Sequence, residues 1–129
     1  MALTAHMVTI DCADPKSLAG FWTEALGYEV VADLGGYLML RPVSGAAGAL
    51  TLSVQEVPEP KAGKNRVHID FEASDRGAEV SRLVSLGARI VAEHSYEDFT
   101  WNILVDPEGN EFCVSGPEQA TPDPSGSSG

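Results

Sequence analysis

His68 and Asp70 place an imidazole and a carboxylate two residues apart in the segment Arg66-Val67-His68-Ile69-Asp70. Residues i and i+2 of a strand share a face, so the two side chains would lie side by side if this segment is extended. An imidazole changes charge near neutral pH and binds metals, so His68 could act as a general base or as a ligand. Held by a hydrogen bond to Asp70, it could equally do no more than shape a binding surface. The residues leave both interpretations open.

Two other reactive side chains admit similar alternatives. Asp11 occupies the position of Asp70 in an earlier copy of the same pattern. The two aspartates could form an acid/base pair, or they could bind backbone and arginine groups at the centre of a sheet. A nucleophilic cysteine needs nearby cations to lower its pKa, and the formal net charge of this chain is -11. We therefore do not expect Cys113 to act as a nucleophile.

The composition is that of one globular domain without a membrane span. The chain has 129 residues, of which 43% are hydrophobic and 21% charged. No apolar run approaches the roughly 20 residues that a bilayer requires. A net charge of -11 repels phosphate backbones and anionic lipids, which disfavours nucleic acid and membrane surfaces as partners. The first residues lack the basic segment of an export signal, so we expect a cytoplasmic protein.

The chain contains an internal duplication. Val8-Thr9-Ile10-Asp11 recurs as Val67-His68-Ile69-Asp70, and each copy is followed by a polar turn, a helical pattern, a Leu-Gly pair and a β-rich run. Apolar residues recur at helical spacing in both copies, at Leu18, Phe21, Trp22 and Ala25, and at Val80, Leu83 and Val84. The expected cap residues are Asp14, followed by Pro15, for the first helix, and Asp75 or Ser74, with Gly87 as the stop, for the second.

Strands are expected after each helix, which gives the order βαβββ twice. The predicted segments are Tyr28 to Ala32, Tyr37 to Arg41, Leu50 to Val57, Arg89 to Glu93, Thr100 to Val105 and Glu111 to Ser115. Asp106-Pro107-Glu108-Gly109 has the composition of a type I turn. The sequence thus predicts an α+β domain over residues 1–116, with half-repeats at about 5–57 and 65–115, and a flexible tail over 117–129. We expect the halves to form one curved eight-stranded mixed sheet, with the helices on its outer face and a concave cup on the other.

Alternation along the strands predicts which side chains line that cup. In four strands the apolar side chains share one face and mostly polar side chains share the other. The apolar set, expected under the helices, comprises Val8, Ile10, Cys12, Leu50, Leu52, Val54, Val67, Ile69, Phe71, Phe112 and Val114. The polar set, expected in the cup, comprises Met7, Thr9, Asp11, Thr51, Ser53, Gln55, His68, Asp70, Glu72, Glu111, Cys113 and Ser115.

Several motifs, in their order and spacing, resemble those of the glyoxalase / bleomycin-resistance / extradiol-dioxygenase superfamily, also called the vicinal oxygen chelate fold. The first half contains Asp14-x6-Phe21-Trp22-x3-Leu26-Gly27. The second half contains Arg66-Val67-His68-Ile69-Asp70, Leu86-Gly87-Ala88 and Asp106-Pro107-Glu108-Gly109-Asn110-Glu111-Phe112. The resemblance covers about residues 5–115, and the chain is most similar to the short glyoxalase-like members.

The resemblance also implies where a metal would bind. In metal-dependent members, four positions on the first, fourth, fifth and last strands hold a divalent ion, typically with His or Gln, Glu, His and Glu. These positions fall here at Met7 (or Thr9, by alignment of the repeats), Gln55, His68 and Cys113. Thioether and amide groups are weak ligands for such ions, and Cys113 stands where a carboxylate is usual. We therefore expect a degraded site without a metal cofactor, and one bound divalent ion is the alternative.

Two functions follow from the resemblance. The first is a small-molecule-binding protein of the glyoxalase/bleomycin-resistance type, which sequesters a ligand such as an antibiotic. The alternative is a metal-dependent glyoxalase-like lyase or isomerase, or a dioxygenase, that uses His68. Tyr37, Phe99 and Trp101 could stack on a flat ligand or pack between halves or subunits. The predicted ligand-binding set is Thr9, Asp11, Tyr37, Gln55, His68, Asp70, Trp101 and Cys113, and a homodimer is expected because half-sheets leave open edges.

Overall fold

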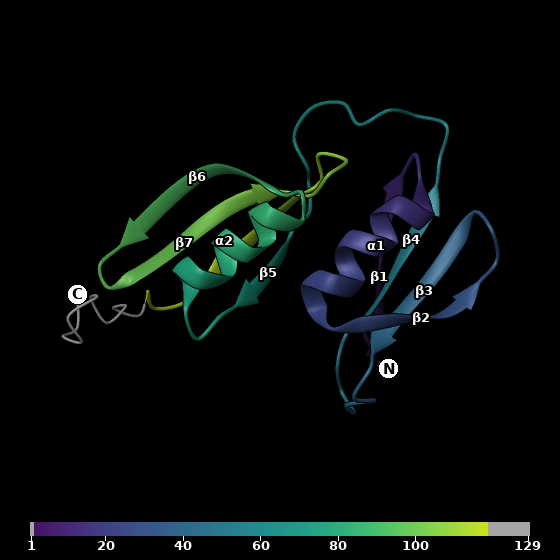
Figure 1. Ribbon diagram of the computed structural model, residues 1–129, viewed down its shortest axis with the longest axis horizontal. Helices are drawn as coiled ribbons and strands as arrows, with labels where there is room; N and C mark the ends of the chain where they lie inside the picture. The colour runs from purple at the N-terminus through teal and green to yellow at the C-terminus, as the bar shows by residue number, and fades with distance from the viewer. Residues whose placement is uncertain (1, 119–129) are drawn as a thin grey trace. The chain divides into compact units, whose positions relative to one another are not determined.

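The protein consists of two compact units, each built around a helix and a four-stranded sheet (Figure 1). The computed structural model describes residues 2–118. The first unit comprises residues 2–64 together with Asp106–Asn110, and the second comprises Asn65–Val105 and residues 111–118. Both units have the element order βαβββ, which confirms the predicted α+β class and the two half-repeats.

The first unit forms a mixed sheet in the order β1-β4-β3-β2. β1 pairs with β4 in parallel, and the other neighbours are antiparallel. The elements are β1 (Met7–Cys12), α1 (Pro15–Leu26), β2 (Tyr28–Asp33), β3 (Tyr37–Pro42) and β4 (Thr51–Glu56). The parallel pair brings the first and last strands of the unit together at its β1 edge.

The second unit repeats this topology in the order β5-β8-β7-β6. Its elements are β5 (Ile69–Glu72), α2 (Arg76–Leu86), β6 (Arg89–Tyr96), β7 (Phe99–Val105) and β8 (Glu111–Ser115). The register repeats as well, because Asp11 pairs with Gln55 in the first unit and Asp70 pairs with Cys113 in the second. The strand pairing gives two separate four-stranded sheets, one in each unit. A single cup lined by both stays a prediction.

Local signals explain where the helices begin and end. Asp14 and Asp75 are extended at the two N-caps, and their side chains accept hydrogen bonds from Ser17 N and Ala78 N. This satisfies amide groups that the first helical turn leaves without a partner. Gly27 ends α1 at φ 70°, a conformation that side chains with a Cβ rarely adopt. The predicted caps are therefore confirmed.

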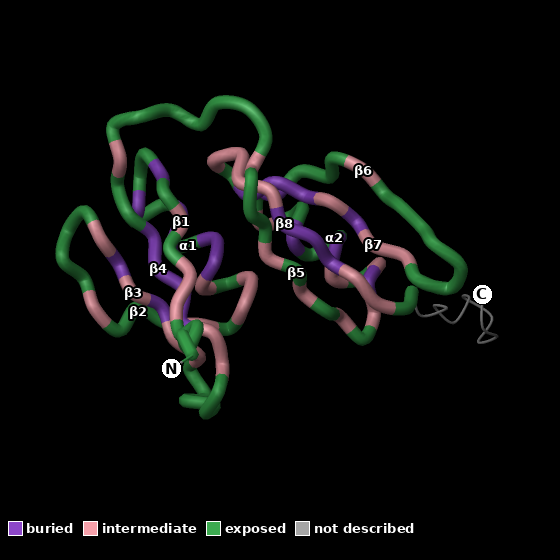
Figure 2. Tube along the Cα trace, turned by 180° about the vertical axis from the view of Figure 1, so that it is seen from behind, coloured by how far each residue is buried: buried purple, intermediate pink, exposed green. Residues whose placement is uncertain are grey.

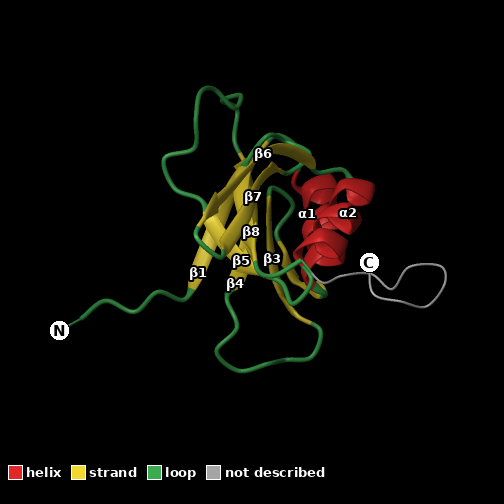
Figure 3. Ribbon diagram, turned by 90° about the vertical axis from the view of Figure 1, so that its left-hand side faces the viewer, coloured by secondary structure: helices red, strands yellow, loops and turns green. Residues whose placement is uncertain are grey.

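Each helix covers one face of its own sheet, and the hydrophobic core lies between the two (Figures 2 and 3). In the first unit Leu18, Phe21 and Trp22 of α1 are buried, as are the sheet residues Leu38, Leu40, Leu52 and Val54. In the second unit Val80 and Leu83 of α2 are buried, as are Leu104, Phe112 and Val114. The sheet residues named here belong to the apolar faces that strand alternation defines, so the predicted division into two faces is confirmed within each unit.

Two strands differ from the prediction by more than one residue at an end. β5 begins only at Ile69, so Val67 lies outside the sheet and is exposed rather than packed under a helix. β6 continues past Glu93 to Tyr96, because it pairs with β7 as far as a tight turn at Glu97 and Asp98. The Ser95 and Thr100 hydroxyls bond at 2.8 Å across this extension. Short polar and aromatic segments of this kind carry little apolar periodicity, so alternation alone gives their ends poorly.

The end of the described chain is attached to α2. Pro117 O accepts a hydrogen bond from Arg76 N at 2.8 Å, and Glu118 forms an ion pair with the Arg76 guanidinium. The rest of the predicted tail, residues 119–129, lies outside the described residues. Over residues 2–118, no helix is long and apolar enough to cross a membrane.

Candidate functional site

The face of the first sheet opposite α1, called here the first open face, carries mostly polar side chains. Its residues follow from the strand register, in which Met7, Thr9 and Asp11 of β1 pair with alternate residues of β4, and these in turn with alternate residues of β3. The set is Met7, Thr9, Asp11, Thr51, Ser53, Gln55, Tyr37, Met39 and Arg41.

A network of hydroxyl groups lies at the centre of the first open face. Thr9 Oγ1 and Ser53 Oγ are 2.9 Å apart, and Tyr37 OH donates to Ser53 Oγ at 3.1 Å. Ser53 is fully buried, with 0% of its surface exposed. Burying a hydroxyl costs free energy unless it is hydrogen-bonded, and here three hydroxyls satisfy one another. The Tyr37 ring is thereby held in one orientation over β4.

Arg41 brings a cation to the same face. Its Nη1 donates to Thr51 Oγ1 at 2.8 Å and to Ala49 O at 3.0 Å. The guanidinium is thus fixed on the strand β3 and attached to the loop that leads into β4. Sequence reasoning placed Ser53 on the polar face but not in the ligand-binding set, and it missed Arg41 as a site residue. The signal that could have found them is their alternation with the apolar residues of two neighbouring strands.

Asp11 and Gln55 form the end of the first open face. They are register partners on the parallel strands β1 and β4, and both are exposed. Met7 pairs instead with Thr51 at the other end of β1, where its sulfur accepts a hydrogen bond from Tyr37 OH at 3.5 Å. Met7 and Gln55 therefore lie at opposite ends of the β1–β4 pair.

The second open face is the face of the second sheet opposite α2, and it holds a compact group of reactive side chains. His68 Nε2 lies 3.2 Å from Asp70 Oδ1. A nitrogen of His68, a carboxylate oxygen of Asp70 and the sulfur of Cys113 all lie within 4.8 Å of one another. The side chains of His68 and Asp70 are 45% and 71% exposed, whereas Cys113 is buried. The structure therefore brings together three residues of the predicted ligand-binding set.

The register of the two units clarifies the metal positions that the resemblance implies. Thr9 lies two residues before Asp11, as His68 lies two before Asp70, so Thr9 and not Met7 is the repeat equivalent of His68. The four positions then offer a hydroxyl, an amide, an imidazole and a thiol. This set contains no carboxylate and does not fit the His/Glu ligation of a divalent ion. Within the second unit, however, Asp70 adds a carboxylate beside His68 and Cys113.

Aromatic side chains extend the second open face along the β6–β7 hairpin. The ring centroids of His94 and Trp101 are 5.5 Å apart, as are those of Phe99 and Trp101. His94, one residue beyond the predicted strand Arg89 to Glu93, lies in β6 opposite Trp101. Tyr37, the other predicted aromatic site residue, lies on the first open face.

Neither cysteine forms a disulfide. Cys12 lies on the helix side of β1, and its Sγ donates to Gln55 O at 3.4 Å. Burial, followed by the nearby carboxylates of Glu108, Asp106, Asp14 and Asp11, raises the pKa of the Cys12 thiol from 9.0 to about 11. The raised pKa keeps the thiol protonated at neutral pH, which disfavours Cys12 as a nucleophile.

Comparison with known proteins assigns the chain to a family. A family model described as a glyoxalase-like domain matches residues 7–115, and the chain belongs to this family. No curated protein matches the sequence.

Solved structures with a similar fold come from several bacteria. A glyoxalase/bleomycin resistance protein/dioxygenase family enzyme from Burkholderia phytofirmans PsJN is 16% identical, with a TM-score of 0.68 over 85% of this chain and 95% of that one. A mutant of the fosfomycin resistance protein FosX from Listeria monocytogenes, complexed with Mn(II) and 1S,2S-dihydroxypropylphosphonic acid, is 15% identical, with a TM-score of 0.71 over 91% and 92%. A lactoylglutathione lyase from Agrobacterium tumefaciens is 18% identical, with a TM-score of 0.63 over 88% and 92%. At these identities the likeness concerns the fold alone.

Proposed function

We propose that this protein binds a small organic molecule on the open faces of its sheets, as a binding protein of the glyoxalase/bleomycin-resistance type. The observation that carries the proposal is the hydroxyl network in which exposed Thr9 and half-buried Tyr37 bond to the fully buried Ser53. An apolar sheet face would avoid the desolvation of these groups, so stability alone does not account for them. A preorganised set of donors and acceptors on a face without a helix suits recognition of a polar ligand.

The comparisons support the chemical class of this ligand. One neighbour of the same fold is a fosfomycin resistance protein complexed with a dihydroxypropylphosphonic acid, which is a small polar organic molecule. Another is described as belonging to a glyoxalase/bleomycin resistance protein/dioxygenase family. We propose by analogy that this chain also binds a small polar molecule, and an antibiotic is one candidate ligand.

A thermal-shift screen of small metabolites and antibiotics, followed by titration of each hit, tests this function. Thr9→Val should weaken a ligand of the first open face about ten- to hundredfold, because it leaves a buried ligand group without its hydrogen bond. His68→Ala should do the same to a ligand of the second open face. His6→Ala is the matched control, since His6 is exposed and precedes β1. A hit that binds the wild type and both site variants equally well would refute the proposal, as would a screen without any hit.

The group formed by His68, Asp70 and Cys113 favours a second candidate, a metal-dependent lyase, isomerase or dioxygenase that uses His68. Imidazole, carboxylate and thiolate are all ligands of zinc, and the three donor atoms lie within 4.8 Å of one another. Elemental analysis of protein purified without chelators separates the two candidates. The binding function predicts little first-row metal. About one metal ion per chain, lost in both His68→Ala and Asp70→Asn, would favour the enzyme instead.

A further inference from the structure

Four aromatic residues form a continuous row at the end of the β6–β7 hairpin, and this row is called here the aromatic ladder. Its members are His94 and Tyr96 on β6 and Phe99 and Trp101 on β7. His94 pairs with Trp101 and Tyr96 pairs with Phe99, so alternation places all four side chains on the same face. Trp101 in turn pairs with Ser115 of β8, which identifies this face as the second open face.

Three rings of the ladder contact one another, and Tyr96 lies exposed beside them at the hairpin end. Trp101 lies between His94 and Phe99 with centroid distances of 5.5 Å on both sides and interplanar angles of 35° and 36°. Such tilted contacts hold the rings as one slab. Tyr96 is 71% exposed and Phe99 55% exposed, and most of β6 is exposed along its length (Figure 2). Aromatic side chains seldom stay this exposed in a row unless they recognise something.

The charges nearest to the ladder are negative. Glu97 and Asp98 form the hairpin turn beside Tyr96 and Phe99, and both are exposed. Glu72 lies on the same face, because it pairs with Ser115, the neighbour of Trp101. Exposed carboxylates of this kind attract cations over about one Debye length, roughly 8–10 Å in physiological salt, beyond which the salt screens them.

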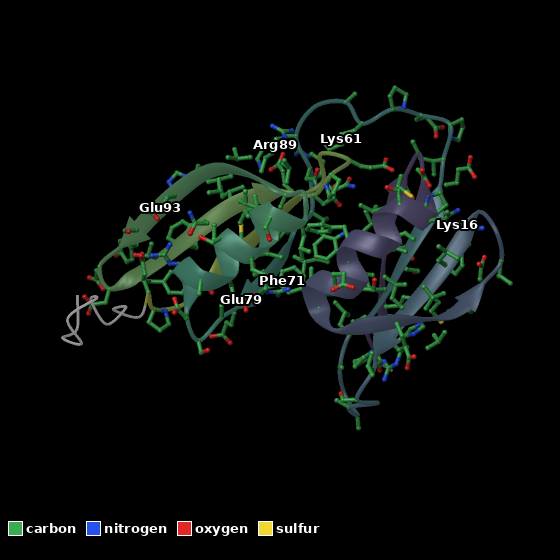
Figure 4. All side chains as sticks on the ribbon, viewed as in Figure 1. Lys16, Lys61, Phe71, Glu79, Arg89 and Glu93 are labelled. Atoms are coloured by element: carbon green, nitrogen blue, oxygen red, sulfur yellow. The ribbon has the colours of Figure 1, made fainter. Side chains whose placement is uncertain are left out.

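The cations of the second unit lie elsewhere. Among its described residues these are Arg66, Arg76, Arg82 and Arg89. Arg66 is exposed in the segment before β5, at the end of that strand opposite Glu72. Arg76 is buried on the helix side in ion pairs with Glu93 and Glu118. Arg82 is paired with Glu79 on α2. Arg89 begins β6, at the end of the strand opposite the hairpin turn (Figure 4). The ladder is therefore an aromatic surface under a negative potential.

We propose that the aromatic ladder is a stacking platform for a planar organic cation. This inference rests on the proposed function and names the ligand class. The faces of Trp, Tyr and Phe rings carry negative charge density, so a flat cation gains both stacking and cation–π attraction there. The carboxylates of Glu97, Asp98 and Glu72 add long-range attraction. A planar anion could stack on the same rings, but the negative potential of the carboxylates would repel it.

Proflavine, a flat cation at neutral pH, is the probe for this inference, with binding followed by its fluorescence anisotropy. Wild-type protein should bind proflavine, and Trp101→Leu should weaken the affinity about five- to tenfold. Phe99→Leu, at the exposed end of the hairpin, should weaken it about two- to fivefold and guards against misfolding of the Trp101 variant. Ile90→Ala is the matched control, because Ile90 is 54% exposed on β6 but pairs with Leu104 of the helix side. It should leave the affinity unchanged.

Competition with two further probes separates the contributions of shape and charge. Pyrenesulfonate, a planar anion, and tetraethylammonium, a cation without a flat ring, should both displace proflavine poorly. The double variant Glu97→Gln/Asp98→Asn should weaken proflavine about two- to fivefold at low salt, and less at high salt. Glu59→Gln in the exposed linker is the charge control.

Three results would overturn the inference. The first is that pyrenesulfonate and proflavine bind equally well. The second is that Trp101→Leu and Phe99→Leu both leave the affinity for proflavine unchanged. The third is that proflavine does not bind and that Trp101→Leu dissociates a dimer of the chain. The last result would make the ladder a contact between copies of the chain. The proposed function is tested separately, because it stands if binding of any screened ligand is weakened by Thr9→Val or by His68→Ala.

Discussion

Trp22 Nε1 of α1 donates a hydrogen bond to Asp106 Oδ2, at 3.2 Å, in the turn that joins β7 to β8. Asp106 is buried, and its other partners are the amides of Glu108 and Asn110 and the side chain of Asn110. The next carboxylate, Glu108, accepts hydrogen bonds from Ala13 N and Asp14 N, just before α1. A turn from the second half of the sequence is thus part of the first unit.

The Trp22–Asp106 bond should contribute to stability in a way that a double-mutant cycle can isolate. Trp22→Phe removes one hydrogen-bond donor from the buried Asp106 carboxylate. Asp106→Asn replaces a carboxylate oxygen, which accepts hydrogen bonds, with an NH2 group that would face the nitrogen donors around it. Each should lower the free energy of unfolding by about 1–3 kcal/mol. Urea denaturation of both single variants and the double variant should show a coupling of about 1 kcal/mol. Additive losses would mean that the two side chains act independently.

Alkaline pH should weaken the protein through Cys12. The folded pKa of about 11 is raised above 9.0, so the stabilisation from the protonated thiol is fully present below pH 9 and is lost as the pH rises through 11. The Cys12→Ala variant should show a smaller fall in melting temperature between pH 8.5 and 10.5. Native protein at pH 8 should also react slowly with iodoacetamide at Cys12. Rapid alkylation there would contradict the raised pKa.

Arg76, the first residue of α2, should contribute to the stability of the protein. It is 6% exposed, and its guanidinium donates to Asn102, Glu93, Glu118 and Gly116 O. Arg76→Lys keeps the charge but cannot reproduce this fork of donors, and a loss of about 2–4 kcal/mol is expected. Arg82→Lys is the control, since its ion pair with Glu79 is partly exposed. Equal effects of the two variants in urea denaturation would argue against a special role of Arg76.

The chain should form a homodimer. β2 and β6 are edge strands, and they expose Val30, Val31, Ile90 and Val91 at 44%, 51%, 54% and 57%. Edges and apolar residues of this kind are commonly covered by a second copy. Light scattering at about 10 µM should report a dimer. Val31→Lys and Val91→Lys should shift it toward the monomer, while Ser81→Lys on the exposed side of α2 should not. A wild-type monomer would remove this prediction.

Local chemistry accounts for most of what could be predicted from the sequence. Caps at Asp14 and Asp75 and glycines after each helix act within one turn, and strand alternation is a property of the extended chain. Duplication then doubled each signal. Strand ends were predicted less well, as in β5 and β6, because pairing partners decide where a strand stops.

The candidate site was predicted in outline. Thr9, Gln55, His68, Asp70 and Cys113 follow from strand parity, and the structure brings His68, Asp70 and Cys113 together. Ser53 was missed as the centre of the hydroxyl network because its role depends on Tyr37, a residue of another strand. The aromatic ladder was predicted only in part, since the pairing of His94 with Trp101 needs the extended hairpin.

The sequence by itself determined the repeated βαβββ order and the polar and apolar face of each strand, because both depend on residues a few positions apart. The tertiary structure alone decided which distant groups meet. It placed the Asp106–Asn110 turn in the first unit, assembled four partners around Arg76 and joined Tyr37 to Ser53. These choices depend on the register between strands and on the burial of polar groups, and neither can be derived from a single segment.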